Sequence, residues 1–221
     1  MSETVRAAFA DEIRELEQDL LKMGNVVEQM LHKSIEALST RNTELADEAI
    51  AMDDIVDDYN LSIENRCLKL LALQQPMARD LRMIAAAMKI ITDIERMGDY
   101  VVDIAKTAKH LAQEPLFKPL KNIPKMADLV KKMLRETLEA FVSRDLDLIQ
   151  HMIDDDDQVD SLNRRLHDEM IDHMQRDASV ADQAVSLIMI SRYLERLADH
   201  VTNVGERVYY METGDIRELH T

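Results

Sequence analysis

Ile94-Glu95-Arg96-Met97-Gly98-Asp99-Tyr100-Val101 occurs a second time in this chain, 100 residues further on, as Leu194-Glu195-Arg196-Leu197-Ala198-Asp199-His200-Val201. Both copies read apolar-Glu-Arg-apolar-small-Asp-x-Val. Residues four apart lie on one face of a helix, about 40° of rotation from each other. Each copy therefore predicts a helix on which a Glu and an Asp point the same way. Because like charges at this spacing repel, we expect a cation nearby.

The duplication extends to the segments that precede each motif. Asp53, Asp57 and Asn60 recur at an offset of 103 as Asp156, Asp160 and Asn163. The same offset relates six further residues, Met23, Met30, Leu31, Glu36, Ala37 and Arg41, to Met126, Met133, Leu134, Glu139, Ala140 and Arg144. The offset then falls to 100, because the second copy has lost three residues near the loop that the first builds from Gln74-Gln75-Pro76.

Composition favours an all-α fold. Of the 221 residues, 46% are hydrophobic and 32% are charged, which is typical of a globular chain. Only four Gly and four Pro interrupt it. Apolar residues at spacings of three and four predict six helices, with approximate bounds Asp11 to Leu38, Thr43 to Ala72, Pro76 to Leu111, Met126 to Val142, Leu146 to Gln175 and Val180 to Met211.

Helices of about 25 to 35 residues would be about 40 to 50 Å long, which favours long antiparallel bundles with short loops. Three of the four prolines fall within residues 114–124, which we interpret as a linker. We therefore predict two tandem three-helix bundles, residues 1–113 and 125–221, placed end to end or side by side. One fused six-helix bundle is the alternative.

The net charge of −16 excludes nucleic acid as a partner, because phosphate contacts need a basic surface. It also disfavours direct adsorption to anionic lipid. The amino terminus has no basic start followed by an apolar run, and no stretch of 18 apolar residues occurs. We expect a cytoplasmic protein. The lone Cys67 agrees with a reducing compartment and is expected to be a small buried residue.

The repeated acids interrupt apolar helix faces. Ile84, Met88, Ile91 and Val102 lie within about 40° of Glu95, and Asp99 and Asp103 continue that stripe. In the second half Asn203 stands where the first has Asp103. In a three-helix bundle every helix neighbours the other two, so each half should gather four or five carboxylates, Asp53, Asp57, Glu95, Asp99 and Asp103 in one and Asp156, Asp160, Glu195 and Asp199, with the amide of Asn203, in the other.

Partly buried carboxylates are costly unless they are paired or bound to metal. Arg96 and Arg196 lie about 100° around the helix from their Glu neighbours and are not aimed at them. A multivalent cation would neutralise such clusters, and carboxylate ligands without thiolate favour hard ions such as Mg²⁺, Mn²⁺, Ca²⁺ or ferric iron. His200, next to Asp199, is a further candidate ligand. The alternative is that these are solvated acidic helix faces, since 43 Asp and Glu residues produce many such pairs.

An enzymatic activity has no support in the sequence. Di-iron carboxylate enzymes carry Glu-x-x-His on their bundle helices. No His of this chain has a Glu three residues before it. Ser/His/Asp arrangements, Gly-rich phosphate loops and Cys-x-x-Cys are also absent from the sequence.

The duplicated motifs, with the stretches at residues 15–24 (Glu-Leu-Glu-Gln-Asp-Leu-Leu-Lys-Met-Gly) and 78–82 (Ala-Arg-Asp-Leu-Arg), resemble the PhoU family of accessory regulators of bacterial phosphate uptake. The resemblance spans essentially the whole chain. It implies a pair of three-helix bundles whose acidic faces carry metal clusters, often of iron, on the ten positions named above; manganese, magnesium and zinc are the other metals considered. Asn203 departs from the symmetry, so we expect the second site to hold metal less tightly or with different nuclearity.

The resemblance also implies a role. Proteins of this family act as negative regulators: under phosphate sufficiency they couple the phosphate ABC transporter, through its ATPase subunit, to the sensor histidine kinase. Membrane contact would then be made only through protein partners, and long exposed helices favour a homodimer. Two alternatives are a carboxylate-bridged metalloenzyme or metal store without a signalling role, and a structural helical protein without metal.

Overall fold

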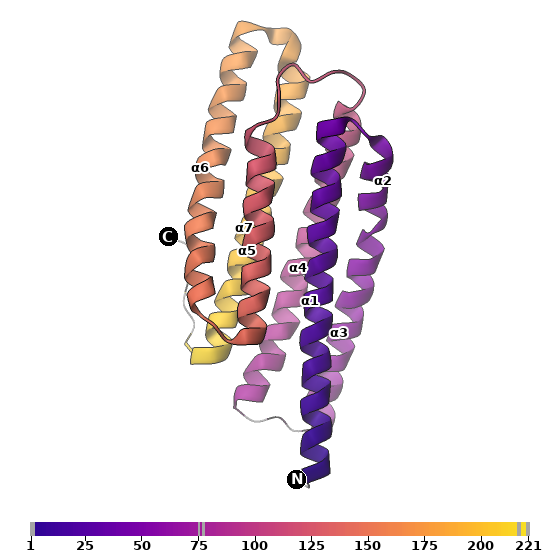
Figure 1. Cartoon of the computed structure of the whole chain (residues 1–221), viewed down its shortest axis with the longest axis vertical. Helices are drawn as coiled ribbons and strands as arrows, with labels where there is room; N and C mark the ends of the chain where they lie inside the picture. Colours follow the sequence, from indigo (N-terminus) through magenta and orange to yellow (C-terminus); the bar gives the residue numbers. More distant parts are fainter. Residues whose placement is uncertain (1–2, 75, 77, 216–217, 220–221) are drawn as a thin grey trace.

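The computed structural model describes residues 3–74, 76, 78–215 and 218–219, and within them the chain is helical without a strand. The helices run up and down along one long axis (Figure 1). Their bounds are α1 Glu3–Thr40, α2 Thr43–Ala51, α3 Asp53–Gln74, α4 Arg79–Leu111, α5 Asn122–Ser143, α6 Asp147–Arg176 and α7 Ala181–Thr213, with a 3₁₀ turn at Ala178–Val180. The predicted all-α fold with long antiparallel helices is confirmed.

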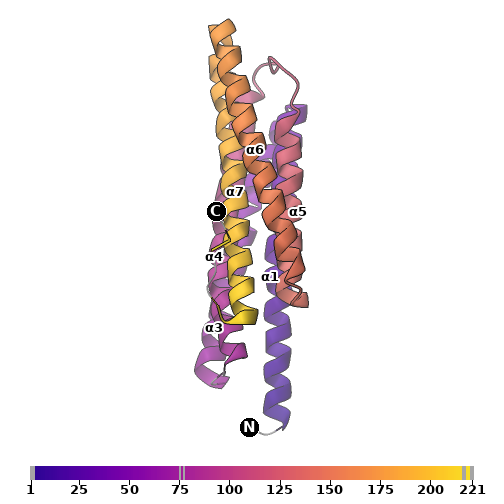
Figure 2. The ribbon, with the colours of Figure 1, turned by 90° about the vertical axis from the view of Figure 1, so that its left-hand side faces the viewer.

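The helices form two layers. α3, α4, α7 and α6 lie side by side in that order, and α1 and α5 cover one face of this four-helix layer (Figure 2). Each half is a three-helix bundle, and the halves meet side by side where α4 contacts α7 and α1 contacts α5. At Gly24 a Cβ atom would collide with Leu138, so the glycine permits the approach of α1 to α5.

Buried residues repeat between the halves as the offset of 103 predicts. Val56 and Val159, Ile63 and Leu166, and Cys67 and Met170 are all buried at equivalent positions of α3 and α6. Apolar residues of both halves belong to one continuous core. Burial raises the pKa of the Cys67 thiol to about 12, so it stays protonated and acts as a small apolar group.

Several helix bounds differ from the prediction. α1 begins at Glu3 instead of Asp11, and α5 begins at Asn122 instead of Met126. The segment predicted as one helix from Thr43 to Ala72 is interrupted at Met52, whose carbonyl accepts the amide of Ile55 at 3.0 Å in a tighter, three-residue turn. The next helix begins at Arg79 instead of Pro76, because Ala78 has a φ of +44° and cannot continue an α-helix. Gln75 lies outside the described residues.

The Pro-rich linker is fastened to the second half. The structure places residues 112–121 between α4 and α5. The Phe117 amide donates to the Gln183 side chain at 3.0 Å, and the Gln183 amide donates to the Pro115 carbonyl at 3.1 Å. These two bonds fix the linker against the start of α7.

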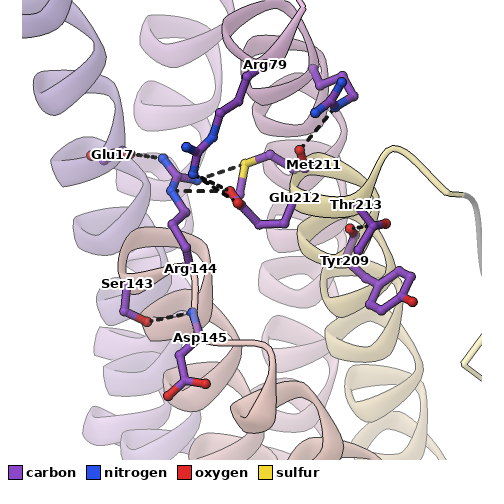
Figure 3. A network of polar contacts seen from close by, with 10 residues as sticks. Glu17, Arg79, Ser143, Arg144, Asp145, Tyr209, Met211, Glu212 and Thr213 are labelled. Carbon is purple, nitrogen blue, oxygen red and sulfur yellow. Dashed lines mark hydrogen bonds and ion pairs between the residues drawn. The ribbon is translucent and has the colours of Figure 1, made fainter.

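Arg144, at the turn after α5, belongs to a polar network that joins α1, α4, α5 and α7 (Figure 3). It has a left-handed φ of +66°, and its guanidinium donates to Glu17 of α1, contacts Met211 Sδ at 3.0 Å and lies 3.5 Å from Glu212 of α7. Arg79 of α4 donates to the same Glu212 carboxylate at 2.9 Å. Burial raises the pKa of Glu17 and Arg144 opposes that rise, so the arginine keeps a half-buried carboxylate ionised.

Replacing Arg144 with Ala should destabilise the protein by about 1–3 kcal/mol, because Glu17 is left half-buried without its cation. The raised pKa of Glu17 makes its ionisation a cost that is present at neutral pH and relieved on acidification, so the loss should be larger at pH 7 than at pH 4. Urea unfolding at both values measures it. The matched control is Arg41→Ala, because Arg41 has the same left-handed backbone but is exposed, and its effect should stay within about 0.5 kcal/mol.

Candidate functional site

The first acidic cluster forms where α3 packs against α4. Asp57 and Asp53 of α3 lie close enough to Glu95 of α4 to raise its pKa, and Asp99 of α4 lies close enough to Asp53 to raise the pKa of that residue. Gly98 sets this approach: a Cβ atom there would stand 2.9 Å from Asp53 Oδ1 and 3.5 Å from Val56 Cγ1. The small residue in the middle of the repeated motif therefore lets a carboxylate of α3 lie directly against the backbone of α4.

Repulsion among these carboxylates is opposed only from a distance, by Lys106 near Asp53 and by Arg96 near Glu95. Burial raises the pKa of Asp53, and Asp57 and Asp99 raise it further. Burial likewise raises the pKa of Glu95, followed by Asp99 and Asp57. Within the described chain, no lysine or arginine comes within ion-pair distance of the five acids predicted for this site, Asp53, Asp57, Glu95, Asp99 and Asp103.

Three of the five acids line a hollow of about 520 Å³, and Asp57 and Glu95 lie outside its lining. Asp53 comes from α3, Asp99 and Asp103 come from α4, and His200 enters from α7. None of the lining residues belongs to α1 or α5, so the hollow lies on the four-helix layer outside those covering helices. It is completed by Arg96, Tyr100, Val102 and Lys106.

The second cluster, between α6 and α7, is partly neutralised by arginines. Burial raises the pKa of Glu195, with Asp199 and Asp160 adding to it and Arg192 and Arg196 opposing it. Arg192 donates to Glu195 Oε1 at 2.7 Å, while Glu195 Oε2 is buried without a hydrogen-bond partner in the described chain. Arg164 pairs with Asp160 at 3.2 Å.

Arg196 lies near both acids of its motif, although its position on the helix does not aim it at Glu195. Its Nη1 lies 3.8 Å from Asp199 and its Nε lies 4.0 Å from Glu195. The side chain is long enough to fold back across 100° of helix surface toward the residue three positions ahead. Arg96 has no such ion pair, although it still lowers the pKa of Glu95 from a distance.

Substitutions between the repeats explain why the two clusters differ. Arg164, which pairs with Asp160, stands where the first half has Leu61, and Arg192, which pairs with Glu195, stands where it has Thr92. The first half therefore lacks the two cations with which the second half neutralises its acids.

His200 and Asn203 take part in a contact between the halves. His200 Nδ1 lies 2.9 Å from Asp93 Oδ1, and the Asn203 amide donates to the same oxygen at 3.4 Å. The centroid of the Tyr100 ring lies 5.7 Å from that of the His200 ring and 6.0 Å from that of the Tyr193 ring. Asn203 is thus turned toward α4, whereas its counterpart Asp103 lines the first hollow.

Sequence reasoning missed Asp93 and Lys106. A signal for Asp93 did exist: the offset of 100 pairs Asp93 with Tyr193 and Tyr100 with His200, and all four are half-buried where α4 meets α7. Lys106 follows Asp103 by three residues on α4, and its positive charge lowers the pKa of Asp53. Asp156 is half-buried on α6, as its place in the repeat predicts.

The donor chemistry fits a hard cation, because the first hollow offers carboxylate oxygens and no thiolate. It is not a preformed cage: within the described part of the chain no three His, Cys, Asp or Glu side chains stand close enough to hold one ion. A bound cation would favour the ionised forms of Asp53 and Glu95, whose pKa values are raised. In the second cluster it would give the buried Glu195 Oε2 a partner.

Fold and site define a tandem helical-repeat protein with duplicated acidic clusters. A family model described as the PhoU domain matches it twice, at residues 20–108 and 123–208, so the chain belongs to the PhoU family. It is 40% identical to the phosphate-specific transport system accessory protein PhoU homolog of Clostridium acetobutylicum, over 95% of this chain and 96% of that protein. The homolog from Aquifex aeolicus is also 40% identical, over 93% of each chain.

Solved structures agree with this assignment. The crystal structure of PhoU from Pseudomonas aeruginosa superposes with a TM-score of 0.89 at 30% identity, covering 94% of this chain and all of that one. The phosphate transport system regulatory protein PhoU from Streptococcus pneumoniae gives a TM-score of 0.86 at 31% identity, covering 95% of this chain and 99% of its own.

Neutralising one acid of the first cluster should stabilise chelator-treated protein. Glu95→Gln removes repulsion from Asp99 and Asp57 without removing an ion pair, so the free energy of unfolding should rise by about 0.5–1 kcal/mol. The matched change Glu195→Gln also breaks the contact with Arg192 and should give no gain. Denaturant unfolding of both variants measures the difference, and equal gains would contradict the asymmetry between the clusters.

Proposed function

We propose that this protein regulates phosphate uptake as an accessory component of a phosphate-specific transport system. The observation that carries the proposal is the match of both repeats to the PhoU domain, with 40% identity to accessory proteins over nearly the full chain. Its action is the negative regulation expected from the family resemblance. In phosphate sufficiency it keeps the phosphate-starvation response off.

The proposed mechanism is that of a cytoplasmic adaptor without catalytic activity. One surface binds the ATPase subunit of the phosphate ABC transporter and another binds the sensor histidine kinase. The long helices support this role, because they offer extended faces for protein contacts. No helix within the described residues is long and apolar enough to cross a membrane, so association with a bilayer is assigned to the partners.

We also propose that the first cluster is the principal cation site. Asp53, Asp57, Glu95, Asp99 and Asp103 would hold a hard metal ion, which adds positive charge to the little that Arg96 and Lys106 provide from a distance. Iron, manganese and magnesium suit the carboxylates better than zinc. The second cluster binds cations more weakly, because Arg164 and Arg192 already oppose its acids.

Metal content tests this assignment. Protein stripped with chelator and dialysed against Mn²⁺ should retain metal in the wild type and lose most of it in Asp99→Asn, whereas Asp199→Asn should lose little. Arg192→Thr gives the second cluster the residue that the first has at Thr92 and should increase its uptake. Elemental analysis after gel filtration provides the measurement; equal losses in both Asp variants would show that the arginines do not discriminate the sites.

Deletion of the gene tests the regulatory role. Phosphate-starvation genes should become active in phosphate-rich medium, and the wild-type chain supplied in trans should silence them. Transcript levels measured in high phosphate distinguish the outcomes. Genes that stay silent in the deletion strain would remove support for negative regulation, and purified protein that turned over oxygen with bound iron would favour a metalloenzyme instead.

A further inference from the structure

α3 exposes an apolar stripe at one end of the four-helix layer. Its buried side packs against α1 and α4. On the opposite side Leu61 is 60% exposed and Leu68 is 49% exposed, and Ala72 is exposed as well. These three residues lie within about 20° of one direction around the helix axis. We refer to Leu61, Leu68 and Ala72 as the outer stripe.

The other end of the layer shows that the fold does not require this stripe. α6 occupies the equivalent place in the second half and shares the buried register of α3. At the positions of Leu61, Leu68 and Ala72 it carries Arg164, Ile171 and Gln175. Two of these three positions of α6 are therefore polar and exposed, and the apolar one, Ile171, is half-buried. Two leucines that are about half exposed or more at the same place on α3 indicate a contact surface.

The charged residues around the outer stripe indicate which kind of partner would fit it. The outer stripe is flanked by Asp54, Asp58 and Glu64, all exposed and none in an ion pair with a described lysine or arginine. Lys69 is the exposed cation on the same side of α3. A helix that covered the leucines would bring its own flanking residues against these acids, so lysine and arginine are favoured there.

We infer that the outer stripe of α3 docks a basic amphipathic helix of a partner protein. This rests on the proposed adaptor function and assigns one of its two protein contacts to a surface. A second copy of the chain fits less well, because each copy would bring the same unpaired acids to the interface and each carries a net charge of −16.

Binding to the two proposed partners provides the test. Purified full-length chain is titrated onto immobilised ATPase subunit and, separately, onto the cytoplasmic part of the sensor kinase. The variant Leu61→Gln with Leu68→Gln, which adds no charge beside Asp57, should weaken binding to one of them by about tenfold or more. Its control on α6, Arg165→Ala with Gln175→Ala, changes two exposed residues outside the acidic clusters and should change neither affinity by more than about twofold.

A second variant tests the contribution of the acidic residues to the proposed interface. Asp58→Asn with Glu64→Gln should weaken the same interaction and reduce its dependence on salt, because electrostatic attraction across the interface is lost. Neither substitution touches the core, since both residues are exposed. Circular dichroism and urea midpoints close to wild type confirm that each variant is folded.

The possible outcomes distinguish a failure of the docking surface from a failure of the proposed adaptor function. A wild-type chain that bound neither partner would overturn both the adaptor role and the docking surface. Binding that survived unchanged in the leucine variant would overturn the docking surface alone. A wild type that sedimented as a dimer and a leucine variant that sedimented as a monomer would assign the outer stripe to self-association and overturn the proposed occupant.

Discussion

The contact between α4 and α7 is the interaction on which the rest of the structure depends. These helices carry the two copies of the repeated motif and pack together in the middle of the four-helix layer. Because they are central, α3 and α6 must lie at the ends, and α1 and α5 must cover the remaining apolar face. The two acidic clusters consequently form on either side of one seam, where Asp93 and His200 bind each other across it.

Periodicity and duplication together predict most of this fold. The helices follow from apolar spacing, and the approach of Asp53 and Asp57 to Glu95 and Asp99 follows from three-helix packing. The break at Met52 could not be predicted, since apolar spacing continues through it. The contact of Arg196 with Asp199 depends on how a flexible side chain folds back, and the Asp93–His200 contact depends on how two bundles meet, which patterns within one helix do not encode.

Divergence between the repeats is informative because the backbone environment is shared. Arg41 and Arg144 have the same left-handed conformation, yet only Arg144 lies in a half-buried network with Glu17 and Glu212. The position of Leu61 holds an arginine in α6, which pairs with Asp160. The difference at this one position thus accounts for one of the two cations that the first cluster lacks and for one of the exposed leucines of α3. The two properties that distinguish the first repeat therefore meet at Leu61.

The two proposed sites are connected physically through one turn of α3. Asp57 and Leu61 are four residues apart on α3, so an ion that drew Asp57 toward α4 would act on the same turn of helix that presents the outer stripe. A ligand that binds only one arrangement stabilises it by RT ln(1 + [L]/Kd), about 2.7 kcal/mol at a hundredfold excess over Kd. That amount exceeds the cost of repulsion between neighbouring carboxylates, which is about 0.2–0.5 kcal/mol for each pair on a helix. A cation bound at the first cluster would therefore stabilise the contact between α3 and α4. It would also hold the outer stripe in the arrangement that a partner binds.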